Sequence, residues 1–450
     1  MTDPMFESLI TSQLRTYAEA GVRPIDRFAI AEETIASGRT MPGWRRGWGL
    51  APMRGHRVLG PLLIGLLLAA LAGGALLVGS RLVAPRTPPH TYLSQLVSAP
   101  DLSMPMAHPA LVPLLDGRVL VIGDAGIWGG TGTRALVYDP ATGVSEATGP
   151  LASSDSLGVE SAVRLKDGRV LVIASTFADP QQDATQVFDP STRRFTPVGS
   201  SVTPRTGAAV ALLPDGHVLI AGGIPSGQDG ATSSAELFDP DTLTFSPTGS
   251  MGTSRQYNST AMLPDGRVFI SPGESRLTVE TYDPSTGTFS AAGTMSSYFH
   301  GNTAIALPDG RVVVVGGSSL SAQGFLEVWD PTSLTFSPGC RPRPCPLVGA
   351  DGGIGAAESD LPGRVTSATL LDDGRLLLIG DTRATTNWSG VYDPATGVTT
   401  PISPTRSYLA KATRLPDGRV LIVGGLTDGR SDHGDGGRSA PAVTTVEIFQ

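Results

Sequence analysis

The closest cluster of possible metal ligands in the sequence lies near the carboxyl end of the chain. Asp428, Asp432, His433 and Asp435 stand within eight residues of one another. Carboxylates and an imidazole can hold a divalent cation, and these four are the candidates if a metal binds. Their spacing differs from that of a calcium loop, which needs ligands at alternate positions and a more distant glutamate. The pattern favours a polar loop, and we predict neither a metal nor another cofactor.

The two cysteines form the second reactive pair. Cys340 and Cys345 are the only cysteines in the chain and have four residues between them in the stretch CRPRPC. A zinc site needs four ligands, and no second cysteine or histidine pair stands nearby. In a domain outside the cytoplasm such a pair is expected to form a disulfide.

The overall charge excludes one class of partner. The chain of 450 residues has a net charge of -8 and an isoelectric point near 5.3. An acidic surface repels polyanions, so we do not expect nucleic acid to bind. Lysine accounts for only two of the 33 basic residues. This arginine bias is typical of a GC-rich, bacterial coding sequence.

An uncharged segment precedes the main part of the chain. Residues 58–80 read VLGPLLIGLLLAALAGGALLVGS and are long enough, as a helix, to cross the hydrocarbon core of a bilayer. Four arginines lie just before the segment and two just after it. The positive-inside rule therefore predicts a single-pass anchor with a cytoplasmic tail (1–57) and the rest of the chain outside. The tail has apolar residues at helical spacing, which allows either a small solvated segment or a site for a cytoplasmic partner.

One phrase repeats seven times after a linker at 81–90. It reads LPDGRVLIVGG at 415–425, and its Asp-Gly pairs begin at residues 116, 167, 215, 265, 309, 373 and 417. Asp-Gly between apolar runs is a strong signal for a β-hairpin. A second phrase, such as VYDPATG at 137–143, follows the first six copies and predicts another hairpin. Four strands in each interval of about 50 residues match the spacing of propeller blades.

These paired phrases resemble the kelch repeat, in the version shared with the galactose-oxidase-like propeller. The resemblance implies an all-β, seven-bladed propeller over residues 91–450. The last copy ends after a third strand at Gln450, so we expect a strand within residues 92–99 to complete the seventh blade. Galactose-oxidase-like enzymes need copper held by tyrosines and histidines, with one tyrosine joined to a cysteine. The positions of the histidines and cysteines in this chain do not supply that set.

The turns within the hairpins are short and similar among the copies, whereas the loops between hairpins vary greatly. The two kinds of connection lie at opposite ends of a four-stranded meander, here named the turn face and the loop face. Variable loops on a rigid scaffold are the usual place for binding. The candidates for the binding face are Trp128, Arg205, Arg255, Tyr257, Tyr298, His300, Trp388, Arg406 and Tyr408. Arg205, Arg255 and Arg406 recur just before the first strand of a blade, which also fits a structural role.

The favoured function is therefore binding rather than catalysis. We expect a membrane-anchored, extracytoplasmic propeller that recognises a protein or a glycan of the cell envelope. The alternative is a carbohydrate-active enzyme, either a diverged galactose-oxidase-like oxidase or a lyase or hydrolase. Neither a sialidase box nor a G-x-S-x-G nucleophile turn is present in the sequence.

Overall fold

The computed structural model describes the repeat region with gaps. The described residues are 95–124, 133–151, 157–176, 185–199, 201, 203, 205–273, 276–296, 302–318, 323–339, 346–348, 354–356, 361–381, 387–426 and 442–450. The predicted tail (1–57), membrane span (58–80) and linker (81–90) lie outside them. Within these residues, no helix has the length and hydropathy needed to cross a membrane.

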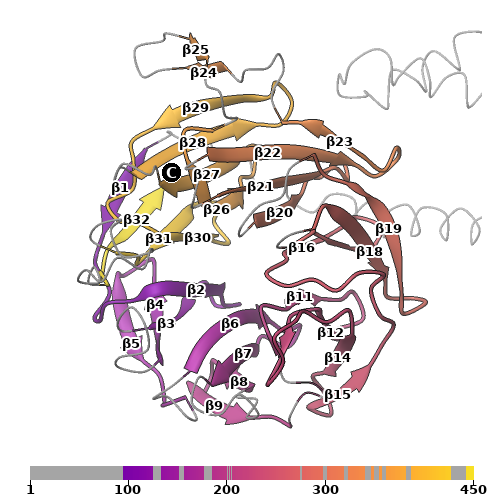
Figure 1. Ribbon diagram of the computed structural model, residues 1–450. Coiled ribbons are helices and arrows are strands. Elements are labelled where there is room, and N and C mark those ends of the chain that lie inside the picture. Colours follow the sequence, from indigo (N-terminus) through magenta and orange to yellow (C-terminus); the bar gives the residue numbers. More distant parts are fainter. Residues whose placement is uncertain are drawn as a thin grey trace, which may run out of the picture. The chain divides into compact units, whose positions relative to one another are not determined.

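The described chain forms seven antiparallel meanders arranged in a ring, which confirms the predicted seven-bladed β-propeller (Figure 1). Each blade has strands A to D, and strand A lies nearest the axis. The first three blades are β2 (Ala107–Pro113), β3 (Val119–Asp124), β4 (Thr133–Asp139), β5 (Val144–Ala147); β6 (Leu157–Arg164), β7 (Val170–Thr176), β8 (Gln186–Asp189), β9 (Arg194–Pro197); and β11 (Ala209–Leu212), β12 (Val218–Ala221), β14 (Ala235–Asp239), β15 (Thr244–Pro247). The short strands β10 (Arg205–Thr206) and β13 (Ile224–Pro225) pair with each other beside blade 3.

The remaining four blades follow the same plan. They are β16 (Thr260–Met262), β17 (Val268–Ile270), β18 (Thr278–Asp283), β19 (Thr288–Thr294); β20 (Asn302–Ala306), β21 (Val312–Ser318), β22 (Gln323–Asp330), β23 (Thr335–Pro338); β26 (Arg364–Leu370), β27 (Leu376–Asp381), β28 (Asn387–Asp393), β29 (Val398–Ile402); and β30 (Lys411–Arg414), β31 (Val420–Val423), β32 (Val446–Phe449), β1 (Leu96–Ala99).

The Asp-Gly phrase forms the turn between strands A and B. In blade 1, Gly117 has φ 88°, a left-handed conformation that glycine adopts without steric cost. Asp116 Oδ1 accepts the N–H of Arg118 at 3.1 Å, and Arg118 Nε donates to Asp116 Oδ2 at 2.8 Å. The aspartate therefore caps the turn and the arginine holds the aspartate, which explains the repetition of Asp-Gly-Arg.

The interior contains seven large apolar clusters, each shared by two neighbouring blades in the described part of the chain, and a smaller eighth cluster between blades 7 and 1. The aromatic residue before each C–D turn is buried in one of them. Trp329, for example, is fully buried, and its Nε1 donates to Ala292 O in the preceding blade at 2.7 Å. The aromatic positions in blades 1 to 7 are Tyr138, Phe188, Phe238, Tyr282, Trp329, Tyr392 and Phe449. Each blade is therefore stabilised mainly by its two neighbours.

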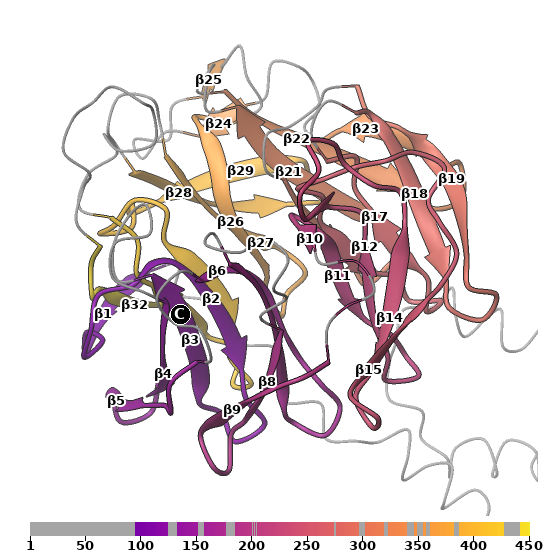
Figure 2. The same ribbon diagram turned by 60° about the horizontal axis from the view of Figure 1, so that its bottom comes forward.

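Strand β1 closes the ring, as the sequence predicts. It pairs antiparallel with β32, with Leu96 opposite Phe449 and Ala99 opposite Val446. Figure 2 shows β1 beside β32, where the chain ends. Leu96 packs into the cluster between blades 6 and 7, and Ala99 packs into the one between blades 7 and 1. One short strand thus contributes to both interfaces of the last blade.

The long insertion between blades 5 and 6 adds a hairpin at the rim of the propeller. Strands β24 (Pro346–Val348) and β25 (Ile354–Ala356) pair with each other, and β24 pairs parallel with the outer strand β29 through Leu347 and Thr399. This hairpin lies beyond β29, at the edge of the ring (Figure 1). The cysteines 340 and 345 of the expected disulfide lie outside the described residues.

Candidate functional site

A recurring irregularity marks the loop-face end of strand A. The residue eight positions before the aspartate of the A–B turn has positive φ in four blades: His108 (45°), Gly207 (65°), Tyr257 (53°) and Leu409 (56°). This position precedes or lies within the start of the innermost strand, and in blade 1 the pairing of β2 with β3 shifts register there. We name these four residues the axial rim.

Glycines at the end of strand B make room for the axial rim. A Cβ added to Gly123, Gly223, Gly273 or Gly425 would lie less than 3.0 Å from the carbonyl oxygen of the residue just before the rim residue of the same blade. Such a distance is shorter than any normal contact, so a side chain cannot be accommodated without moving the backbone. The glycine at this end of strand B is therefore required by the close approach of the backbone that leads into strand A.

Two residues of the axial rim present large side chains at the loop face. Tyr257 is 45% exposed, and its ring lies over Gly207, the rim residue of the preceding blade. The N–H of Tyr257 also donates to Gly207 O at 2.7 Å. His108 is exposed at the corresponding position of blade 1. A left-handed conformation is unfavourable for a tyrosine, and strain of this kind is concentrated at functional sites.

His108 is absent from the candidates that the sequence suggested. Its position relative to the turn aspartate is the same as that of Tyr257, so counting back from each Asp-Gly pair would have found it. The loss of register at the bulge hides the equivalence, because the alternation of side chains along strand A is broken at this point.

Two of the candidate arginines are buried in ion pairs. Arg205 pairs with Glu236 and Arg255 pairs with Glu280, and the side chains of the two arginines are 2% and 0% exposed. Arg255 also donates from Nη1 to Ser271 O at 3.1 Å and to Thr278 O at 2.8 Å. Burial lowers the pKa of Arg255, and the charge of Glu280 opposes that effect. These arginines join the loop that enters a blade to strand C of that blade.

Arg406 lies differently in blade 7. Its side chain is 46% exposed, with Nη1 at 3.6 Å from Asp101 Oδ1. Its backbone N–H donates to Glu447 Oε2 at 2.8 Å, and Glu447 occupies the position of Glu236 and Glu280 in the repeat. Arg406 stands eleven residues before its turn aspartate, whereas Arg205 and Arg255 stand ten residues before theirs. Glu447 is consequently buried without the guanidinium contact of the other two, and burial raises its pKa.

We expect Glu447→Gln to increase the stability of the propeller at neutral pH. The raised pKa of Glu447 means that the folded state binds its proton more tightly than the unfolded state does. The stabilising effect of this tighter proton binding is fully present at a pH below the pKa that Glu447 has in the unfolded chain. It is lost as the pH rises through the pKa that Glu447 has in the folded state. Thermal unfolding at pH 7 and at acidic pH should therefore show a gain for the variant that shrinks on acidification. A loss of stability at pH 7 would contradict the prediction; Gln186, at this position in blade 2, shows that the fold accepts glutamine.

The other candidates lie in the interior or outside the described residues. Trp388 is 8% exposed and packs in the cluster between blades 5 and 6, and Tyr408 is 9% exposed and packs against Ala107 and Leu426. The candidates at 128, 298 and 300, together with the weak metal candidates at 428, 432, 433 and 435, lie outside the described residues.

Two asparagines with buried, unsatisfied amide atoms stand seven residues before the turn aspartates of their blades. Asn258 is 8% exposed, and neither its Oδ1 nor its Nδ2 has a hydrogen-bond partner. Asn302 occupies the same position in blade 5; its Oδ1 accepts from Ser259 Oγ at 2.7 Å, and its Nδ2 has no partner. Unsatisfied buried groups cost about 1–3 kcal/mol each, so a water molecule or a ligand hydroxyl that reached these amides would be held strongly.

The described residues do not fit a copper centre of the galactose-oxidase type. His108 lies at the loop face, whereas His217 lies at the turn face with Nδ1 3.1 Å from Asp215 Oδ2. No group of three or more histidine, cysteine, aspartate or glutamate side chains is close enough to bind a metal within this part of the chain.

Comparison with solved structures identifies the fold. A fungal alcohol oxidase of the AA5 family, solved in complex with copper, is 16% identical in sequence with a TM-score of 0.55, and the match covers 79% of this chain and 75% of that one. The chain has the fold of a galactose-oxidase-like propeller. At this identity the likeness extends to the fold alone. No family model matches the sequence, and no curated protein does.

Proposed function

We propose that the protein is a membrane-anchored, extracytoplasmic propeller whose loop face binds a protein or a glycan of the cell envelope. The exposed, left-handed Tyr257 is the observation that carries the proposal. A conformation of this kind costs about 1–3 kcal/mol and persists where the surrounding structure imposes it. Here the close packing of Gln256 O against Gly273 and the hydrogen bond from the N–H of Tyr257 to Gly207 O hold the ring at the loop face. Tyrosine combines a large apolar face with a polar tip, as binding surfaces require.

The membrane anchor supports the location of this binding surface. The uncharged segment 58–80 and the excess of arginine before it favour a propeller outside the cytoplasm. A linker of about ten residues reaches at most about 35 Å, which would keep the propeller close to the envelope. The partner is therefore expected among proteins and glycans of that compartment. The amphipathic pattern in residues 1–57 leaves a second, cytoplasmic partner as part of the proposal.

We expect Tyr257→Asn to weaken partner binding without weakening the fold. Asparagine tolerates the left-handed conformation better than tyrosine does, so the backbone conformation at position 257 is retained while the ring is lost. The immobilised protein should retain a protein or glycan from an envelope extract, and the variant should retain at least about tenfold less, a change of about 1.4 kcal/mol. Circular dichroism and thermal unfolding would confirm that the variant is folded.

Val144→Ser is the matched control, because Val144 is 53% exposed but belongs to β5 at the rim of the propeller. Equal capture by wild type and Tyr257→Asn would refute the assignment of the loop face. Stoichiometric copper in the purified protein, together with turnover of sugars or alcohols, would instead favour the alternative of a carbohydrate-active oxidase.

A further inference from the structure

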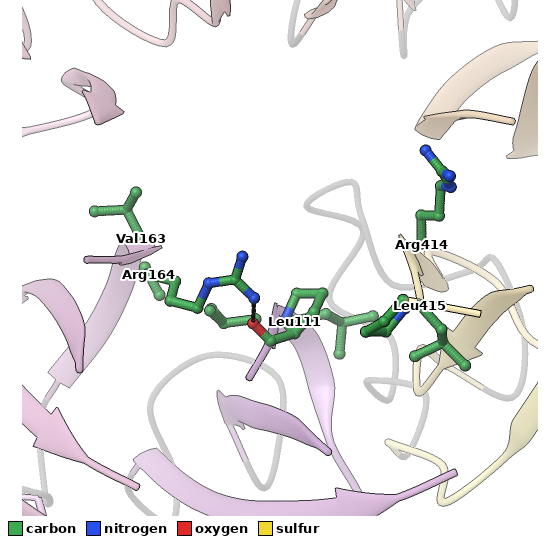
Figure 3. Close-up of a pocket in the computed structure, with 9 residues that line it drawn as sticks. Leu111, Val163, Arg164, Arg414 and Leu415 are labelled. Atoms are coloured by element: carbon green, nitrogen blue, oxygen red, sulfur yellow. Dashed lines mark hydrogen bonds between the residues drawn. The ribbon is translucent and has the colours of Figure 1, made fainter. Parts of the chain in front are cut away.

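A cavity lies at the turn face, at the end of the propeller opposite the axial rim. Its volume is about 590 Å³, and it is lined by strands A of blades 1, 2 and 7 and by the start of the A–B turn in blade 7. Figure 3 shows Val163 and Arg164 on one side, Arg414 and Leu415 on the other, and Leu111 between them. Cavities of this size accommodate small organic molecules rather than macromolecules.

Two guanidinium groups provide the polar part of the cavity. Arg164 Nη1 donates to Pro113 O at 2.6 Å, and no carboxylate pairs with Arg164 among the described residues. Arg414 pairs with Asp372 of the neighbouring blade, and its side chain remains 41% exposed. The local charge is therefore positive, although the whole chain has a net charge of -8. A guanidinium has five N–H donors, so the contact with Pro113 leaves most donors of Arg164 available.

The rest of the lining is apolar. Leu111 and Val163 contribute partly buried aliphatic side chains, and Pro113 contributes its ring. A fully hydrated inorganic anion would gain nothing from these walls, whereas an organic acid would bury its hydrocarbon part against them. Arginine binds carboxylates through parallel hydrogen bonds, which fixes the direction in which such an acid enters.

We propose that this cavity binds a small organic acid, with its carboxylate on Arg164 and its apolar body against Leu111, Val163 and Pro113. The site is independent of the loop face and of any partner that binds there. The propeller would then have a macromolecular surface at one end and a small-molecule site at the other.

The test uses the full-length protein in lipid nanodiscs and 3-phenylpropanoate as the probe, with empty nanodiscs as the background. Saturation-transfer NMR and a titration should show binding of the acid, and the neutral 3-phenylpropan-1-ol should bind at least about tenfold more weakly. Arg164→Gln should reduce the affinity for the acid by a similar factor, and Arg164→Lys should retain part of it. Arg118→Gln serves as the matched control, because Arg118 lies on the same face in a local pair with Asp116.

A second variant tests the cavity without changing its charge. Ala162 lines the cavity, and Ala162→Met would fill part of it. We expect this variant to lose binding of the acid while Arg164 remains in place. Equal affinity for the acid and the alcohol, unchanged affinity in both Arg164→Gln and Ala162→Met, or no binding of the acid at millimolar concentration would each overturn the proposal.

Discussion

Removal of strand β1 is expected to destabilise the whole propeller, not only its last blade. A fragment that begins at Asp101 lacks the pairing of Leu96–Ala99 with Val446–Phe449. Strand β32, which is buried along its length, would become an unpaired edge. Both interfaces of blade 7 would lose apolar contacts, because Leu96 and Ala99 pack into different clusters. Thermal unfolding of fragments 86–450 and 101–450 should show a much lower and broader transition for the shorter one.

Two point variants test how much stability comes from the side-chain packing of β1, because they leave the strand in place. Leu96→Ser removes a side chain that packs between blades 6 and 7 and should cost about 1–2 kcal/mol. Val97→Ser changes the adjacent residue, which is 40% exposed, and should cost much less. Equal melting temperatures for the two fragments would show that the ring does not depend on this closure.

The second large effect is expected at the buried pair of Arg255 and Glu280. Arg255→Met leaves the carboxylate of Glu280, whose side chain is 7% exposed, without its guanidinium. An uncompensated buried charge costs about 3–5 kcal/mol. Chemical denaturation should therefore show a loss of this size, and the loop that precedes β16 should exchange its amide hydrogens faster.

A double variant identifies charge as the cause. Glu280 also accepts the N–H of Gly252 at 2.8 Å, and glutamine can keep that hydrogen bond without the charge. Adding Glu280→Gln to Arg255→Met should therefore restore at least about 1 kcal/mol, a coupling typical of residues in contact. Arg406→Met is the matched control, because an exposed arginine 3.6 Å from its partner should contribute about 0–1 kcal/mol. Additive losses from the two substitutions at 255 and 280 would contradict this explanation.

The two predictions depend on the same property of the ring. Each blade buries its two faces against its neighbours. A substitution at one interface therefore destabilises the other blades only if the ring opens or a loop detaches from its blade. Strand β1 keeps the ring closed, and the buried arginines keep the loops attached to their blades. The turns, by contrast, are held by local contacts such as that of Arg118 with Asp116, and substitutions there should have small effects.

The sequence alone determined the architecture of the repeat region. The Asp-Gly and Asp-Pro turns are set by interactions within three or four residues, as in the contacts of Asp116 with Arg118 and of Asp139 with Thr142. Short-range rules suffice for such turns, and their regular spacing then predicts seven blades. The closure by a strand within residues 92–99 could also be derived, because a ring with three strands in its last blade would leave an edge.

The tertiary structure decided what the individual side chains do. Arg255 and Arg406 occupy similar places in the sequence, yet one is buried against Glu280 and the other is exposed beside Asp101, because a shift of one residue turns the side chain to the other side. Tyr257 and His108 have left-handed backbone conformations that depend on a glycine at the end of strand B. The cavity around Arg164 joins strands of blades 1, 2 and 7, which only ring closure brings together. These features arise from contacts between residues tens to hundreds of positions apart. Counting back from the Asp-Gly pairs marks the equivalent positions in the sequence, but it does not show what surrounds each side chain.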